Sequence, residues 1–210
     1  MKLYSYFRSS AAFRVRIAMN LKGLAYEPSF VHLPRGEHRA PAYGAINPQA
    51  LVPTLEDDGA LLTQSLAIIE YLDETRLGVP LLPKDAIGRA RVRSLAMLIA
   101  CEIHPVNNLR ILQHLKRALG QNDEQVNAWY RHWIADGLAK FEADLANAPG
   151  KFCHGDSPTM ADCCLVPQVF NAQRYQCDVA VYPATMRIFA ECMKLDAFDR
   201  AQPSKQPDAE

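Results

Sequence analysis

Two serines next to the first apolar run are the first residues that could do chemistry. Arg8, Ser9 and Ser10 precede a run rich in Ala, Val, Ile and Leu, so the hydroxyls stand at the expected start of a helix. The free amides and partial positive charge of a helix N-terminus favour an anion. One serine is expected to cap the helix, and the other can donate to a bound anion. Redox proteins carry Cys-x-x-Cys in such a turn; residues 9–12 read Ser-Ser-Ala-Ala, which excludes dithiol chemistry.

Two further places could hold a peptide-like ligand. Gln64 and Ser65 begin a second predicted helix, where a hydroxyl and free amides suit a carboxylate; the simpler interpretation is a helix cap. Val52-Pro53 follows a loop and precedes a predicted strand. Its position suggests a cis peptide bond, although sequence does not determine the isomer.

A third polar group lies further along the chain. His104, Asn107 and Asn108 are expected to share one arc of a long helix, with Arg110 beside them. A solvated helix face is the simpler interpretation, but a kink at Pro105 favours a polar cleft. Arg174 ends a later apolar helix, where a cation also complements the helix C-terminus.

Composition limits the possible classes of protein. The 210 residues include 23 Lys and Arg and 23 Asp and Glu, and 49% are apolar, which excludes a disordered chain and argues against nucleic acid or an anionic membrane as partner. The six cysteines all follow residue 100, without the spacing of a zinc site, and are interpreted as small core residues, so no metal is expected. No signal peptide and no membrane-length apolar run are found. A reduced, cytoplasmic protein is therefore expected.

The elements that must position these residues fall into two groups that meet near residue 80. Before it, strands are predicted at residues 2–6 and 26–33 around a helix at 11–21, with Pro28 indicating an edge strand. A hairpin turn at Asp57-Asp58-Gly59 and a helix at residues 65–76 follow.

After residue 80 the pattern is helical, with one long segment at 86–119 interrupted at Pro105 and further helices at 123–147, from Thr159 to 173, and at 183–193. The polar residues 202–210 are expected to fray. We expect an α/β domain over residues 1–80 and an all-helical domain over 81–210.

Taken together, the layout resembles the cytosolic glutathione transferases, and within them the zeta class of maleylacetoacetate and maleylpyruvate isomerases. The resemblance covers nearly the whole chain. It rests on the order and spacing of residues 4–10, 14–18, 47–48, 52–55, 64–72, 104–110, 160–162 and 165–169, and of Arg174. The family implies a thioredoxin-like domain, a helical domain, a homodimer and bound glutathione.

The resemblance also implies roles for individual residues. Ser9 and Ser10 correspond to the serines that bind the glutathione thiolate, and Val52, before Pro53, to the residue whose backbone pairs with the cysteinyl unit. Gln64 and Ser65 would hold the γ-glutamyl end. His38, Gln49, His104 and Asn108 are weaker candidates for the same ligand. The family motif is usually Ser-Ser-Cys, and Ala11 takes the place of the cysteine.

The implied reaction is a cis–trans isomerisation. The glutathione thiolate would add to the double bond of a dianionic maleyl acid, allow rotation and leave. Arg8, Arg110 and Arg174 are the candidates for binding the substrate carboxylates, and Arg8 is also a catalytic candidate beside Ser9 and Ser10.

The sequence leaves alternatives open. Maleylacetoacetate is favoured over maleylpyruvate as the substrate because the opening Tyr-Phe-Arg-Ser-Ser resembles that isomerase more closely. Glutathione conjugation or dehalogenation of small α-halo acids would use the same thiolate. A non-catalytic module of the same fold is disfavoured by the intact residues Ser9, Ser10, Gln64 and Ser65.

Overall fold

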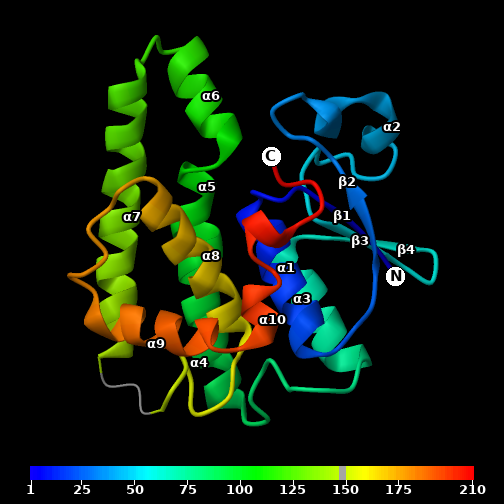
Figure 1. The fold of residues 1–210 in the computed structure, drawn as a ribbon, viewed down its shortest axis with the longest axis vertical. Helices are drawn as coiled ribbons and strands as arrows, with labels where there is room; N and C mark the ends of the chain where they lie inside the picture. The colour runs from blue at the N-terminus through cyan, green and yellow to red at the C-terminus, as the bar shows by residue number, and fades with distance from the viewer. Residues whose placement is uncertain (147–149) are drawn as a thin grey trace. The chain divides into compact units, whose positions relative to one another are not determined.

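The computed structural model describes residues 1–146 and 150–210, which divide into two compact units, Met1–Leu82 with Met193–Glu210 and Pro83–Cys192 (Figure 1). This division differs from the expected 1–80 and 81–210, because the last segment packs with the first unit. Its helix α10 (Asp196–Asp199) lies against α1 (Ser10–Leu21), and the Asn20 amide donates to the Ala197 carbonyl at 2.9 Å.

The first unit is built on a four-stranded sheet in the order β2-β1-β3-β4. Strand β1 (Lys2–Ser5) runs parallel to β2 (Glu27–Phe30) and antiparallel to β3 (Thr54–Asp57), which pairs with β4 (Ala60–Thr63). With α1, the short α2 (Pro41–Gly44) and α3 (Ser65–Thr75), this confirms the predicted β-α-β and β-β-α order. Strand β2, which contains Pro28, is an edge strand as expected.

Local sequence explains where these elements stop and turn. Lys22 ends α1, and Gly23, with φ 65°, reverses the chain there; the amides of Gly23 and Leu24 bond back to Asn20 and Met19 at 3.1 and 2.9 Å, a Schellman motif. The hairpin between β3 and β4 turns at Asp58 and Gly59, both with positive φ, as its sequence predicts.

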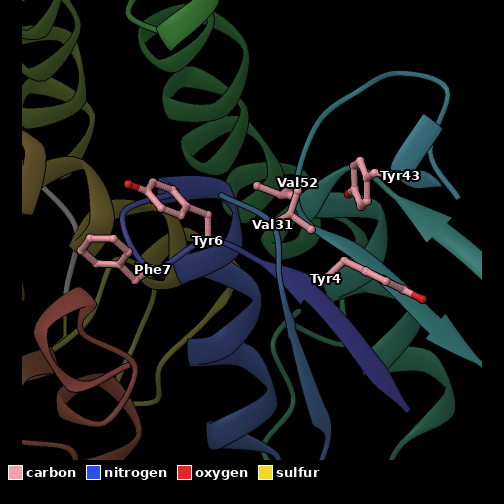
Figure 2. Close-up of a cluster of buried hydrophobic side chains, with 6 residues drawn as sticks. All are labelled: Tyr4, Tyr6, Phe7, Val31, Tyr43 and Val52. Carbon is pink, nitrogen blue, oxygen red and sulfur yellow. The ribbon is translucent and has the colours of Figure 1, made fainter. Parts of the chain in front are cut away.

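Successive residues of β1 belong to two different apolar clusters. Leu3 on β1 pairs with Leu55 on β3, and both are fully buried, as are Ile68, Ile69 and Leu72 of α3. The neighbouring Tyr4 belongs to a different cluster, which reaches from the end of β1 to the loop before β3 (Figure 2). Its members are Tyr4, Tyr6, Phe7, Val31, Tyr43 and Val52. This second cluster supports the two loops that carry the candidate residues.

The second unit is helical. Its helices are α4 (Ala86–Met97), α5 (His104–Val106), α6 (Leu109–Arg117), α7 (Asp123–Leu145), α8 (Met160–Arg174) and α9 (Pro183–Met193), the last reaching one residue beyond the unit. Residue 147, at the end of the predicted 123–147 helix, lies outside the described residues. Thr159 and Asp162 form a capping box at the start of α8, and Asp162 also accepts from the Cys153 amide at 2.9 Å.

The predicted long helix is interrupted at two places. Residues Leu98–Ile103 form a π-helix immediately before His104-Pro105. Pro105 has no backbone N–H to donate, and the wider π-helical turn accommodates it. The chain then leaves the helix at Asn107 and restarts at Asn108, which caps α6 in an extended conformation. Gly137 of α7 packs against this π-helix so closely that a Cβ atom would lie 2.2 Å from Cγ1 of Ile103.

The described residues contain no helix that is both long and apolar enough to span a membrane, and no cluster of three or more His, Cys, Asp or Glu suited to a metal ion. All six cysteines are free thiols; Cys153, Cys163, Cys164 and Cys192 are buried as expected, whereas Cys101 is exposed. Burial raises the pKa of Cys153 and of Cys192, so these thiols stay protonated and unreactive at neutral pH.

Candidate functional site

Ser9 is the residue that caps α1. Its side chain accepts from the Ala12 amide at 3.2 Å, and its own amide donates to the Tyr6 carbonyl at 2.9 Å. Accepting through oxygen leaves the hydroxyl proton of Ser9 available for a bound anion. No acidic residue lies in the first turn of α1, so no side chain of that turn offsets the partial positive charge of this helix end.

The neighbours of Ser9 differ from it in exposure. Ser10 is the first residue of α1 and is buried, with 8% of its surface exposed, whereas Ser9 is half-buried. Arg8 is exposed, and its guanidinium lies over the Phe7 ring, 4.9 Å from the centroid. Of the two serines, Ser9 is therefore the more accessible to a ligand.

The Val52–Pro53 peptide bond is cis. The preceding Leu51 carbonyl accepts from the Tyr43 hydroxyl at 2.7 Å and from the Asn47 side-chain amide at 2.8 Å. Tyr43 on α2 and Asn47 in the loop itself thus both bind the backbone just before Val52. Among the described residues, the backbone N–H and carbonyl of Val52 have no hydrogen-bond partner, so both can pair with an extended peptide as a strand would.

The start of α3 has the features of a carboxylate site. Gln64 has φ 70° and ψ 116°, which is unusual for a residue with a side chain, and no side chain caps the helix. Ser65 is buried, and its hydroxyl oxygen accepts from Nη1 of Arg14 at 3.2 Å, which leaves the hydroxyl proton free to donate. The free amides, the Ser65 hydroxyl and the helix dipole all favour an anion.

Gln49 joins this group and His38 does not. Nε2 of Gln64 donates to Oε1 of Gln49 at 2.7 Å, and the Gln49 amide donates to Oδ1 of Asn47 at 3.0 Å. His38 lies in the 3₁₀ helix Glu37–Arg39, is buried, and has no partner at Nδ1 within the described part of the chain. Burial, and then the charge of Arg39, lower the pKa of His38, so its imidazole is neutral at pH 7.

The remaining candidates lie in the second unit. His104 and Asn108 are close, with Nε2 and Nδ2 3.5 Å apart, but the expected single helical arc is wrong because α5 ends before Asn107. Asn108 uses its side chain to accept from the Arg110 amide at 3.2 Å, and Arg110 is exposed on α6. Asn107 is turned inward and donates to the Tyr130 carbonyl at 3.3 Å.

Arg174 ends α8, as predicted, and is held among aromatic rings. Its guanidinium lies 4.9 Å from the centroid of the Tyr175 ring, which stacks on Tyr130 with 3.6 Å between centroids. Burial raises the pKa of Tyr130, and the neighbouring Arg174 opposes this shift. Sequence reasoning overlooked Tyr130 because an aromatic residue in a helical stripe is indistinguishable from ordinary core.

Sequence reasoning also overlooked Arg14, Tyr43 and Asn47. A signal was present for Arg14, since a cation within the apolar run 11–21 is rarely buried without a partner. Tyr43 and Asn47 gave no such signal, because their common target is a backbone carbonyl.

Comparison with known proteins identifies the family. Residues 3–80 match the model of the glutathione S-transferase N-terminal domain. A maleylacetoacetate isomerase of Rhizobium meliloti (strain 1021) is 52% identical over 204 residues, with 97% of this chain and 96% of the relative covered.

Solved structures agree over the full length of both chains. A holo maleylpyruvate isomerase, described as a bacterial zeta-class glutathione S-transferase, superposes with a TM-score of 0.97 at 50% identity. A maleylacetoacetate isomerase from Methylobacterium extorquens AM1, crystallised with malonate and glutathione, has the same TM-score at 46% identity. The chain therefore belongs to the zeta class of the glutathione transferase family.

Proposed function

We propose that this protein is a glutathione-dependent isomerase that converts a maleyl acid to its fumaryl isomer, with maleylacetoacetate as the favoured substrate. The observation that carries the proposal is the half-buried Ser9 hydroxyl, which caps α1 and keeps its proton for an anion. The names of the relatives, maleylacetoacetate and maleylpyruvate isomerase, supply the reaction.

The first unit fits glutathione in three places. The α3 N-terminus, with Ser65 and Gln64, suits the γ-glutamyl carboxylate, and Gln49 orients the Gln64 amide. The unpaired backbone of Val52 suits the cysteinyl unit, and Ser9 suits its sulfur. When bound, glutathione supplies a thiolate that adds reversibly to the cis double bond and so permits rotation. His38 is a weaker candidate, since no described contact links it to Gln49, Gln64 or Ser9.

Ser9 and the end of α1 can hold the sulfur as a thiolate. A free thiol has a pKa of about 8.5, and lowering it by about two units needs roughly 2.7 kcal/mol. One hydrogen bond to a charged group contributes about 1.5–3 kcal/mol, and a helix N-terminus about 0.3–1 kcal/mol. No cationic base is needed at this turn. Ser10, being buried, is a weaker candidate for the same role.

Cationic side chains on this chain would hold the dianionic substrate. Arg8 and Arg110 are exposed, and Arg174 is oriented by Tyr175. Guanidinium groups bind carboxylates in a two-pronged geometry and would also stabilise negative charge that develops during rotation. His104 and Asn108, whose side chains are 3.5 Å apart, are further glutathione candidates. In this proposal residues 1–80 form most of the glutathione site and also supply Arg8, whereas residues 81–210 supply Arg110 and Arg174 for the acid.

The deciding experiment measures isomerisation of maleylacetoacetate and of maleylpyruvate, each with and without glutathione. Activity only with glutathione, and higher kcat/KM on maleylacetoacetate, is expected. Higher kcat/KM on maleylpyruvate would establish the second candidate, which the likeness to the holo maleylpyruvate isomerase supports.

Two other outcomes would overturn the proposal. Activity on α-halo acids alone would indicate a glutathione transferase or dehalogenase. A chain that does not bind immobilised glutathione would be a non-catalytic module.

A homodimer in the cytoplasm is also proposed. The six free thiols support a reducing compartment.

A further inference from the structure

The turn that carries Arg8 and Ser9 needs partners from outside itself. The Ser9 amide closes the turn on the Tyr6 carbonyl at 2.9 Å, which places Phe7 and Arg8 at its centre. Phe7 is 3% exposed and packs edge-on against Tyr6 in the second cluster (Figure 2). Because buried backbone groups are almost always paired, the N–H and carbonyl of Phe7 need hydrogen bonds that the turn does not supply.

The two bonds come from side chains 201 and nine positions away in the sequence. The Phe7 N–H donates to Oδ2 of Asp208 at 2.9 Å, and the Phe7 carbonyl accepts from Nη2 of Arg16 at 3.0 Å. Nη1 of Arg16 also donates to the Ser5 hydroxyl at 3.2 Å, so the same guanidinium binds the last residue of β1. The central peptide groups of the turn are thus held from two sides.

Arg16 also links the turn to the segment that contains Asp208. Its Nε donates to the Ala201 carbonyl at 3.1 Å. Burial lowers the pKa of Arg16 to about 10, and electrostatic interactions with Tyr26 and Asp208 oppose this shift, so the guanidinium stays charged at neutral pH. Arg16 and Asp208 therefore interact as opposite charges on the two sides of Phe7.

The segment of residues 201–210 is itself anchored, contrary to the expectation that residues 202–210 fray. Ala201 and Pro203 are buried, and Nε2 of Gln206 donates to the Arg200 and Gln202 carbonyls, each at 2.9 Å. Beyond Asp208, the Glu210 carboxylate contacts Nε2 of His32 and a guanidinium nitrogen of Arg35, each at 3.0 Å. Asp208 is thus held on both sides along the chain.

We propose that Asp208, together with Arg16, is a positioning residue that fixes the Phe7 peptide groups and thereby the Ser9 hydroxyl and the Arg8 guanidinium. Ser9 follows Phe7 by two residues and bonds back across it, and Arg8 lies over the Phe7 ring. The inference rests on the proposed function of that turn. It adds a role for residues 201–210, which contact the turn through the bond from the Phe7 N–H to Asp208.

Charge alone predicts the opposite effect from positioning. A carboxylate near the turn disfavours a thiolate at Ser9, so removing only its charge would lower the pKa of the bound thiol. If the hydrogen bond to Phe7 is what matters, Asp208→Asn preserves function because the amide oxygen still accepts from the Phe7 N–H. Asp208→Ala then raises the thiol pKa, because the turn relaxes.

The test measures the pKa of bound glutathione, from the ultraviolet absorbance of the thiolate against pH, together with kcat and KM for both maleyl acids. Asp208→Ala is expected to raise that pKa and to lower kcat about tenfold, since small displacements of a catalytic group cost that much or more, with a smaller change in glutathione KM. Asp208→Asn is expected to stay within about twofold of the parent. Ser204→Ala is the matched control in the same segment, because Ser204 is exposed, and it is expected to keep parental values.

If Asp208→Ala does not fold, Asp208→Glu takes its place; it keeps the charge, displaces the carboxylate by one methylene and is expected to lower kcat in the same direction. Unchanged thiol pKa and kcat, or a loss of thermal stability alone, would overturn the inference. A parent that binds glutathione but isomerises neither acid defeats the proposed function only, because the thiol pKa is measured without the acid.

Discussion

Ser9 combines two hydrogen-bonding roles in one side chain. Its oxygen accepts from Ala12 to cap α1, and its proton is left for a ligand. The neighbouring Ser10 is buried in the helix, and Ala11 offers no thiol. At the scale of single residues, we therefore propose that glutathione supplies the reactive sulfur and that Ser9 receives it.

Ser9→Ala should raise the pKa of the bound thiol by about one to two units, because a hydrogen bond to a charged group is worth about 1.5–3 kcal/mol. The measurement is kcat against pH, and at pH 7 kcat should fall about tenfold or more. Ser9→Thr, which keeps the hydroxyl, is the control and should retain most activity. Near-normal activity of Ser9→Ala would transfer the role to Ser10 or to the helix amides.

Replacing Arg8 or Arg174 by Ala should raise KM for the dianionic acid more than KM for glutathione, because each guanidinium is proposed to bind a substrate carboxylate. The expected increase is about tenfold or more for each, as charge-assisted hydrogen bonds contribute about 1.5–3 kcal/mol. Steady-state kinetics with each substrate varied in turn measures this. Arg187→Ala, an exposed arginine on α9 that bonds only the Gly150 carbonyl among the described residues, is the control. Equal effects on both constants would refute the carboxylate assignment.

At the scale of elements, the break around Pro105 separates groups that a continuous helix would have aligned. The π-helix Leu98–Ile103 widens the chain before Pro105, and Asn108 restarts the chain as the α6 cap. Sequence predicted an interruption at Pro105, since the proline lacks an amide proton and its ring clashes with the preceding turn. It did not predict that Asn107 would turn inward toward Tyr130, because that depends on packing against α7.

The close contact between α7 and the π-helix leaves no room for a side chain at residue 137. Gly137→Ala places a Cβ 2.2 Å from Cγ1 of Ile103, so the free energy of unfolding should fall by about 1–3 kcal/mol in urea denaturation. Gly44→Ala is the matched control, because nothing lies within 4 Å of its Cβ position. Adding Ile103→Ala to Gly137→Ala should give a smaller total loss than the two single losses added together. Additive losses would show that the contact is not what excludes a side chain.

At the scale of the whole molecule, the formal net charge of zero conceals cations with separate tasks. Arg14 bonds Ser65 and Arg16 bonds Phe7, whereas Arg8, Arg110 and Arg174 are the residues proposed to bind a dianion. A balanced total argues against a polyanionic partner such as nucleic acid, but it does not oppose a small anionic ligand in a local site.

The proposed homodimer belongs to this scale. Light scattering of the purified protein should give twice the 23.5 kDa chain mass, independent of glutathione. A mass equal to that of one chain across the micromolar range would contradict the prediction.

The sequence by itself determined the local features of this protein. The strand and helix order, the Schellman end at Gly23, the turn at Asp58-Gly59 and the Thr159–Asp162 capping box follow from neighbouring residues, because caps and turns depend on side chains a few positions apart. The serines at the start of α1 were identified in the same way, with Ser9 or Ser10 as the cap.

Only the tertiary structure decided the long-range features. Arg14 reaches Ser65 across 51 positions and Asp208 reaches Phe7 across 201, pairings that no local preference specifies. The cis isomer at Val52–Pro53 and the grip of Tyr43 and Asn47 on Leu51 likewise depend on the folded loop. Residues 202–210, polar and containing two prolines, resemble a disordered end in isolation. In the fold the buried Phe7 amide donates to Asp208 of this segment, and Arg16 bonds the adjoining Ala201 carbonyl.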